Sequence, residues 1–223
     1  MAARQLYLHT IIFMERLACQ SQGSDSTELE GEHMKSEKTF EVDLNVEELA
    51  NTEILIAAAE TEDEMGCVLR FHLMLERLLT FYLKEKCKGE IAVYAKLPRD
   101  FGQKLGLAAA FGLPLPIAAV IHHVNSMRNK LAHGMKTAID QGDAQQLSRL
   151  VNSMSAIEPE FHPVEKRYIT IHSMNPDVRI KYGSEVRTDF LIASFAFWAV
   201  STKALIMEAA LNKIVPNQKR NTP

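Results

Sequence analysis

The apolar residues of this chain recur at intervals of three and four over long stretches, the spacing that places side chains on one face of an α-helix. One such stretch runs to about Lys86, with Thr61 or Asp63 as its N-cap and Gly89 as its stop. Its apolar positions are Met65, Val68, Leu69, Leu75, Leu79, Tyr82 and Leu83. Another begins at Pro116 and stops at Gly134. Its apolar positions are Ile117, Val120, Ile121, Val124, Met127 and Leu131. Such one-sided helices must bury their stripes against each other, which favours a helical bundle.

The remaining sequence adds further helices and one change of period. The other predicted helices are Val46 to Ala59, Phe101 to Phe111, Asp143 to Ile157, and Thr188 to about Val215. Between the last two, Arg167 to His172 and Val178 to Tyr182 alternate in polarity around the turn sequence Asn175-Pro176-Asp177. This pattern is typical of a β-hairpin. We therefore expect a mainly α fold, a helical bundle with a small β-hairpin insertion at about residues 165–184.

The domain organisation follows from composition. Residues 1–40 form an N-terminal extension with an acidic, polar linker, since Cys19 to Lys38 shows no periodicity. One helical domain is expected over residues 41–215 and a polar tail over 216–223. A chain of 223 residues that is 47% hydrophobic can bury one sizeable core.

The cysteines and the apolar stretches bear on location. Cys19, Cys67 and Cys87 are too widely spaced for a disulfide framework or a zinc knuckle, which favours a reducing cytoplasm. Glu15 and Arg16 stand where a leader cleavage site should be uncharged, so export is not expected. No consecutive run of about 18 apolar residues occurs, so no membrane association is expected.

Charge is unevenly distributed along the chain. The segment from Asp25 to Glu64 holds fourteen acidic and two basic residues, whereas the part from Met65 onward holds 21 basic and 13 acidic residues. This asymmetry indicates either a polyanion partner for the basic part or an acidic segment that only increases solubility.

Several familiar sites are excluded or weak. The chain has no HExxH, phosphate-loop or G-x-S-x-G motif, and neighbouring His122 and His123 point about 100° apart on a helix, so no metal and no cofactor is expected. The spacing of Gly102 and Gly106 predicts close helix packing. His72, on an apolar helix face, is expected to be a hydrogen-bonded core residue.

The stretch from Arg128 to Gly134 carries the clearest chemistry. An imidazole can exchange a proton with the 2′-hydroxyl or the leaving oxygen of RNA, and a guanidinium can hold the phosphate, so Arg128 and His133 form a minimal metal-independent ribonuclease pair. Asn129 and His133 are four residues apart and can hydrogen-bond. Arg128 and His133, however, project about 140° apart from a straight helix. A broken helix or a second subunit must bring them together.

The sequence Arg128-Asn129-Lys130-Leu131-Ala132-His133 resembles the Arg-x4-His motif of the HEPN superfamily. The order of flanking elements, over roughly Thr61 to Ile157, is similar to that of the mannitol-repressor-like (MltR-like) branch. The resemblance implies a cytoplasmic endoribonuclease of toxin or defence type, a homodimer with the motif at its interface, and a cognate antitoxin or regulatory protein as a further partner. Arg128 would stabilise the phosphate, His133 would transfer protons, and Asn129 would orient the histidine or contact RNA. Lys130 and Lys136 would bind RNA. Met135 replaces the tyrosine of one toxin branch, so regulation by tyrosine modification is not expected.

The alternative is a non-catalytic, MltR-like regulatory or protein-interaction domain. In that case Asn129 and His133 would satisfy backbone groups at a buried helix end, and Arg128 would pair with an acidic neighbour. No helix-turn-helix pattern is present, so sequence-specific DNA binding is not expected under either hypothesis.

Overall fold

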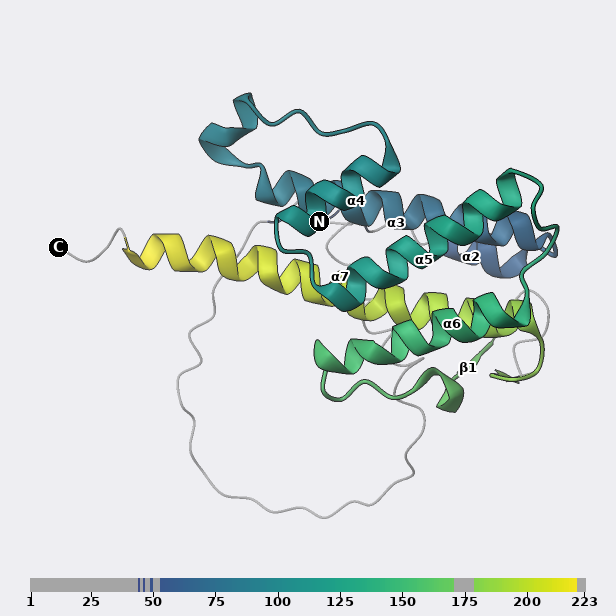
Figure 1. Ribbon diagram of the computed structural model, residues 1–223. Helices are drawn as coiled ribbons and strands as arrows, with labels where there is room; N and C mark the ends of the chain where they lie inside the picture. The colour runs from purple at the N-terminus through teal and green to yellow at the C-terminus, as the bar shows by residue number, and fades with distance from the viewer. Residues whose placement is uncertain (1–43, 45, 47–48, 50–52, 171–178, 220–223) are drawn as a thin grey trace, which may run out of the picture.

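The computed structural model describes Leu44, Val46, Leu49 and residues 53–170 and 179–219, with side chains as far as Lys213 (Figure 1). The helices are α2 (Glu53–Glu60), α3 (Glu64–Lys86), α4 (Phe101–Ala110), α5 (Leu115–Ala132), α6 (Gln141–Asn152) and α7 (Val186–Lys219). Short 3-10 turns are η1 (Gly89–Val93), η2 (Ser153–Ala156) and η3 (Val164–Lys166). Strands β1 (Tyr168–Ile169) and β2 (Ile180–Lys181) complete the described elements. The predicted mainly α fold with a small hairpin is therefore confirmed.

Local side-chain chemistry sets where several helices begin. Asp63 caps α3 by accepting hydrogen bonds from the backbone N–H groups of Met65 and Gly66. Asp100 caps α4, and Asp140 caps α6, in the same way. These carboxylates satisfy N–H groups that the first helical turn leaves without partners.

Helix α3 lies at the centre of the bundle. It contacts α2, α4, α5 and α7, and α6 covers α5 and α7 (Figure 1). Phe71 of α3 meets Phe190 and Phe197 of α7 edge to face, with ring centroids 6.0 and 6.4 Å apart. Leu75, Leu78 and Leu79 are fully buried along the same helix. The apolar stripe read from the sequence is thus buried except at Leu69, which is 36% exposed, and at Met65, which is only partly buried.

The hairpin is short and is attached to α6. Tyr168 pairs with Lys181 and Ile169 with Ile180, antiparallel as predicted. The Tyr182 hydroxyl, just after β2, donates to Ser148 Oγ of α6 over 3.0 Å. The expected turn at 175–177 lies outside the described residues.

Four predicted details differ from the structure. Leu49 N donates to Val46 O in a turn, and the first described helix begins only at Glu53. Helix α6 ends at Asn152 instead of continuing to Ile157, and α7 ends at Lys219, beyond the predicted Val215. The interpretation of Gly102 and Gly106 as a packing contact is wrong, because both are exposed. A Cβ placed at Gly106 would meet no atom within 4 Å.

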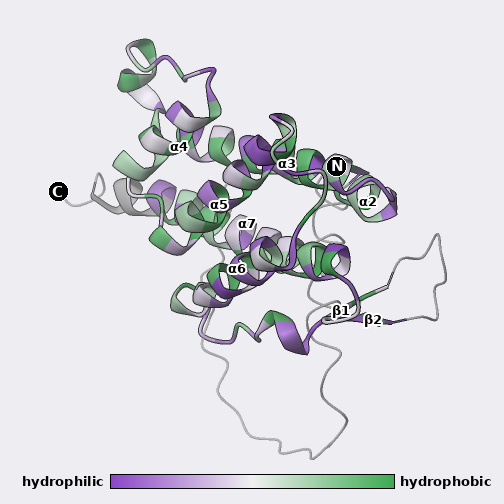
Figure 2. Ribbon diagram, turned by 45° about the vertical axis from the view of Figure 1, so that its right-hand side comes forward, coloured by the Kyte–Doolittle hydropathy of each residue, from purple (hydrophilic) through white to green (hydrophobic). Residues whose placement is uncertain are grey.

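One described helix is long and apolar enough to cross a membrane by length and composition alone. It covers Val186–Lys213 within α7, and 61% of its most apolar window is buried in the bundle. Figure 2 shows α7 lying among the other helices. A mostly buried core helix can have the same length and composition as a membrane span.

Arg187 of α7 holds the end of α2 in place. Its Nη2 donates to the carbonyl oxygens of Ala59 and Thr61, each over 2.6 Å. These are carbonyls at and after the last helical turn, which have no partner within the helix. The side chain thereby joins the start of α7, the last described helix, to the end of α2, the first.

We expect Arg187→Ala to lower the free energy of unfolding by about 1–3 kcal/mol, because it leaves partly buried carbonyl groups without donors. Urea denaturation of the full chain measures the change. Arg149→Ala is the matched control, because Arg149 makes only an exposed contact of 3.4 Å to Gln146. Equal stability losses in the two variants would contradict the capping role of Arg187.

Candidate functional site at the end of helix α5

The motif lies at the C-terminal end of α5. Met127 and Leu131, on the apolar stripe, are 2% and 4% exposed and hold this end against the core. Arg128 and Asn129 are half-buried beside them. His133 is the C-cap, its N–H donating to Asn129 O over 3.0 Å. Gly134 follows at φ +67°, a left-handed conformation that turns the chain away from the helix.

Arg128 is directed toward the bundle. Its Nη1 donates to Asn129 Oδ1 over 3.0 Å. Its Nε is buried and has no hydrogen-bond partner within the described part of the chain. Among the same residues the guanidinium forms no ion pair with a carboxylate. Arg128 therefore keeps its positive charge uncompensated by any described neighbour.

His72 of α3 lies across the helix interface from α5. Its Nε2 is 3.0 Å from Asn125 Oδ1 of α5, and the ring of Phe101 stacks on it with centroids 4.0 Å apart. Burial lowers the pKa of His72, the bond to Asn125 opposes this, and the charge of Arg128 lowers it further. The prediction of a hydrogen-bonded core histidine is confirmed.

His133 has the opposite environment. Its side chain is exposed and makes no hydrogen bond to any described residue. The expected hydrogen bond between the side chains of Asn129 and His133 is not formed. Asn129 Oδ1 accepts from Arg128 instead. The structure thus places Arg128 and His133 on one helix end but does not join them within one chain.

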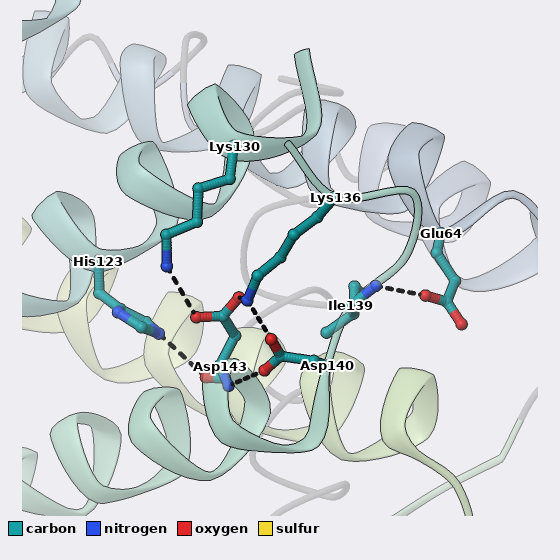
Figure 3. Close-up of polar contacts among 7 residues, drawn as sticks. All are labelled: Glu64, His123, Lys130, Lys136, Ile139, Asp140 and Asp143. Atoms are coloured by element: carbon teal, nitrogen blue, oxygen red, sulfur yellow. Dashed lines mark hydrogen bonds and ion pairs between the residues drawn. The ribbon is translucent and has the colours of Figure 1, made fainter. Parts of the chain in front are cut away.

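Lys130 and Lys136 converge on one carboxylate (Figure 3). Lys130 Nζ lies 3.2 Å from Asp143 Oδ1, and Lys136 Nζ lies 2.6 Å from Asp143 Oδ2. Lys136 also bonds to the capping residue Asp140. The bond to Asp140, and then that to Asp143, raises the pKa of Lys136, and the same contact lowers the pKa of Asp140. Both expected RNA-binding lysines are therefore in ion pairs.

Asp143 is the residue of this site that the sequence did not identify. It is 8% exposed, its N–H donates to Asp140 Oδ1, and its carbonyl accepts from His123 Nε2 over 2.9 Å. The loop before it is tied to α3 by Glu64 Oε2, which accepts from Ile139 N (Figure 3). An acidic residue in the first turn of an amphipathic helix was the only signal, and that signal is also typical of an ordinary surface position.

The remaining histidines and the described cysteines do not form a further site among the described residues. His123 bonds to a backbone carbonyl and His122 is exposed. In the described part of the chain, no three His, Cys, Asp or Glu side chains lie together as a metal ion would need. Cys67 and Cys87 are buried thiols, and burial raises the pKa of Cys67 to about 12.

Comparison with protein-family models, with curated proteins and with solved structures gives no match for this chain. The site must therefore be interpreted from its own residues.

The lowered pKa of His72 predicts a dependence of stability on pH. The unfolded chain binds a proton at His72 near pH 6.5, whereas the folded chain binds it only at lower pH. The contribution of the neutral ring is present above this value and is lost as the pH falls toward the folded pKa.

We expect unfolding free energies measured by urea between pH 8 and pH 5 to fall less in His72→Gln than in the wild type over the acidic part of this range. His122→Gln, on an exposed side chain of α5, should keep the wild-type slope. Parallel curves for His72→Gln and wild type would exclude His72 as the titrating group.

Proposed function

We propose that the protein is a cytoplasmic, metal-independent endoribonuclease of the HEPN type that acts as a homodimer. Arg128 would hold the scissile phosphate, and His133 would exchange a proton with the 2′-hydroxyl or the leaving oxygen. Asn129, bonded to Arg128, would orient the guanidinium. The reaction would need no metal and no cofactor, because the nucleophile is the RNA's own 2′-oxygen.

The observation that carries this proposal is that the side chains of Arg128, Asn129 and His133 do not make the contacts expected of a structural motif. An architectural motif would need Arg128 paired with a carboxylate and His133 or Asn129 bonded to backbone groups at a buried helix end. Instead His133 is exposed without a described partner, Asn129 accepts from Arg128, and the guanidinium has no described carboxylate. The guanidinium therefore has no described carboxylate that an RNA phosphate would have to displace, and the imidazole is open to solvent.

The dimer is part of the proposal because of helix geometry. Helix α5 is regular up to Ala132, so Arg128 and His133 still project about 140° apart. In a twofold dimer the Arg128 of one protomer can meet the His133 of the other. Each active site would then need both chains.

A second candidate is a non-catalytic regulatory domain that binds a protein. Two observations favour it. The 3-10 turn η1 and the residue after it expose large apolar side chains, with Val93 and Tyr94 at 80% and 85%. Lys130 and Lys136 are also neutralised by acidic neighbours. An antitoxin or regulatory protein is the partner that this candidate would need.

We expect the wild-type protein to cleave RNA in EDTA and to leave 2′,3′-cyclic phosphate ends, detected by mass spectrometry of the products. Arg128→Ala and His133→Ala should each lower the rate by at least about 100-fold. His133 is exposed, so His133→Ala should keep the wild-type unfolding midpoint. Intact RNA with the wild type would favour the regulatory candidate.

We also expect two inactive variants to restore each other. When Arg128→Ala and His133→Ala are mixed and allowed to exchange subunits, each mixed dimer holds one site with both residues. About a quarter of the wild-type activity should return, since half of the dimers are mixed and each has one working site of two. A mixture that stays inactive, with exchange confirmed by tagged subunits, would exclude a site shared between protomers.

A further inference from the structure

The two lysines of the site surround His133 symmetrically along the chain. Lys130 lies three residues before it and Lys136 three residues after it. Their ammonium groups nevertheless turn to the same carboxylate and occupy its two oxygens separately. Two cations that converge on two oxygens of one anion form an arrangement suited to a phosphate group.

Asp143 is held by backbone contacts and is more buried than the two lysines that pair with it. Asp143 is held through its backbone by Asp140 Oδ1 and His123 Nε2, and its side chain is only 11% exposed. The side chains of Lys130 and Lys136 are 36% and 29% exposed. Each lysine has a flexible four-carbon stem, so the ammonium groups can leave the carboxylate while the carboxylate stays in place.

The two ion pairs differ in length. The contact between Lys130 and Asp143 is 3.2 Å long, beyond the usual 2.7–2.9 Å of a charge-assisted bond, whereas Lys136 Nζ lies 2.6 Å from Asp143. The Lys130 contact is therefore the easier of the two to exchange. A phosphate carries the same charge as the carboxylate and offers further acceptor oxygens. RNA also carries a series of such phosphates, so it can replace the carboxylate as the partner of the lysines.

We propose that Asp143 stands in for an RNA phosphate: in the RNA-free protein its carboxylate masks Lys130 and Lys136, and RNA binding transfers both lysines to the backbone beside His133. This inference rests on the proposed function because it takes RNA as the ligand. It adds a regulation of that site, since the affinity for RNA is held down by an acidic group of the same chain.

Binding is measured by fluorescence anisotropy with a labelled oligouridylate that carries 2′-O-methyl groups. This probe cannot be cleaved through its 2′-oxygens, so binding is read whether or not the protein is a nuclease. Asp143→Asn should bind about 3- to 10-fold more tightly than the wild type. The slope of log affinity against log salt concentration should steepen by about 0.7 for each lysine that Asp143→Asn releases. Because Asp140 still pairs with Lys136, we expect the slope to change by about 0.7–1.4 in total.

The lysine variants complete a cycle. In the wild type, Lys130→Gln with Lys136→Gln should change affinity by less than about twofold, because each lysine gives up its contact with Asp143 when it gains one with RNA, and the two contacts offset each other. In the Asp143→Asn background the same changes should remove the whole gain. Glu158→Gln is the matched control for net charge, because it removes a carboxylate that pairs with Lys203 over 2.6 Å on another part of the bundle.

Two results would overturn the proposal. One is a gain in Asp143→Asn no larger than that in Glu158→Gln. The other is a loss of about fivefold or more when both lysines are changed in the wild type, because the lysines would then bind RNA with little competition from Asp143. This second measurement does not depend on the folding of Asp143→Asn. Failure of the wild type to cleave unmodified RNA would instead contradict the nuclease function, and the binding cycle would still be read.

Discussion

The burial of the apolar face of α3 against four other helices is the constraint on which the rest of the structure depends. Its apolar residues pack against α2, α4, α5 and α7, and Phe71 joins it to the aromatic residues of α7. Because the apolar face of α5 packs against α3, the polar C-terminal end of α5 is fixed relative to the core. The functional chemistry of the chain therefore stands on a rigid support.

The end of α5 separates its polar residues into two environments. Toward the core, Arg128 lies near neutral His72 and has Asn129 as its described hydrogen-bond partner. Toward solvent, His133 leaves the helix at a point where Gly134 turns the chain. A guanidinium on one side and an imidazole on the other fit a site that two protomers assemble. Under the proposed function each chain would be inactive by itself, which would couple activity to association.

The charges of Lys130 and Lys136 are balanced within the chain. Asp143 and Asp140 match Lys130 and Lys136, so the basic excess of the sequence after Met65 does not appear as a bare cationic surface at the motif. Counting charges along the sequence gives the net value but not the pairing, because pairing depends on which helices are neighbours. Local neutrality of this kind lowers non-specific attraction to polyanions while it keeps the cations in place.

Local sequence patterns predicted most of the helix positions, a cap of α3 at Thr61 or Asp63, the hairpin and the angle between Arg128 and His133. These features depend on residues close in the chain, and the periods of helix and strand express them directly. Helix packing set the contacts of Asp143 with two lysines, the open space beside Gly106 and the exposure of His133. Such contacts join residues of different helices, and their partners follow from how the helices pack, which local spacing does not specify.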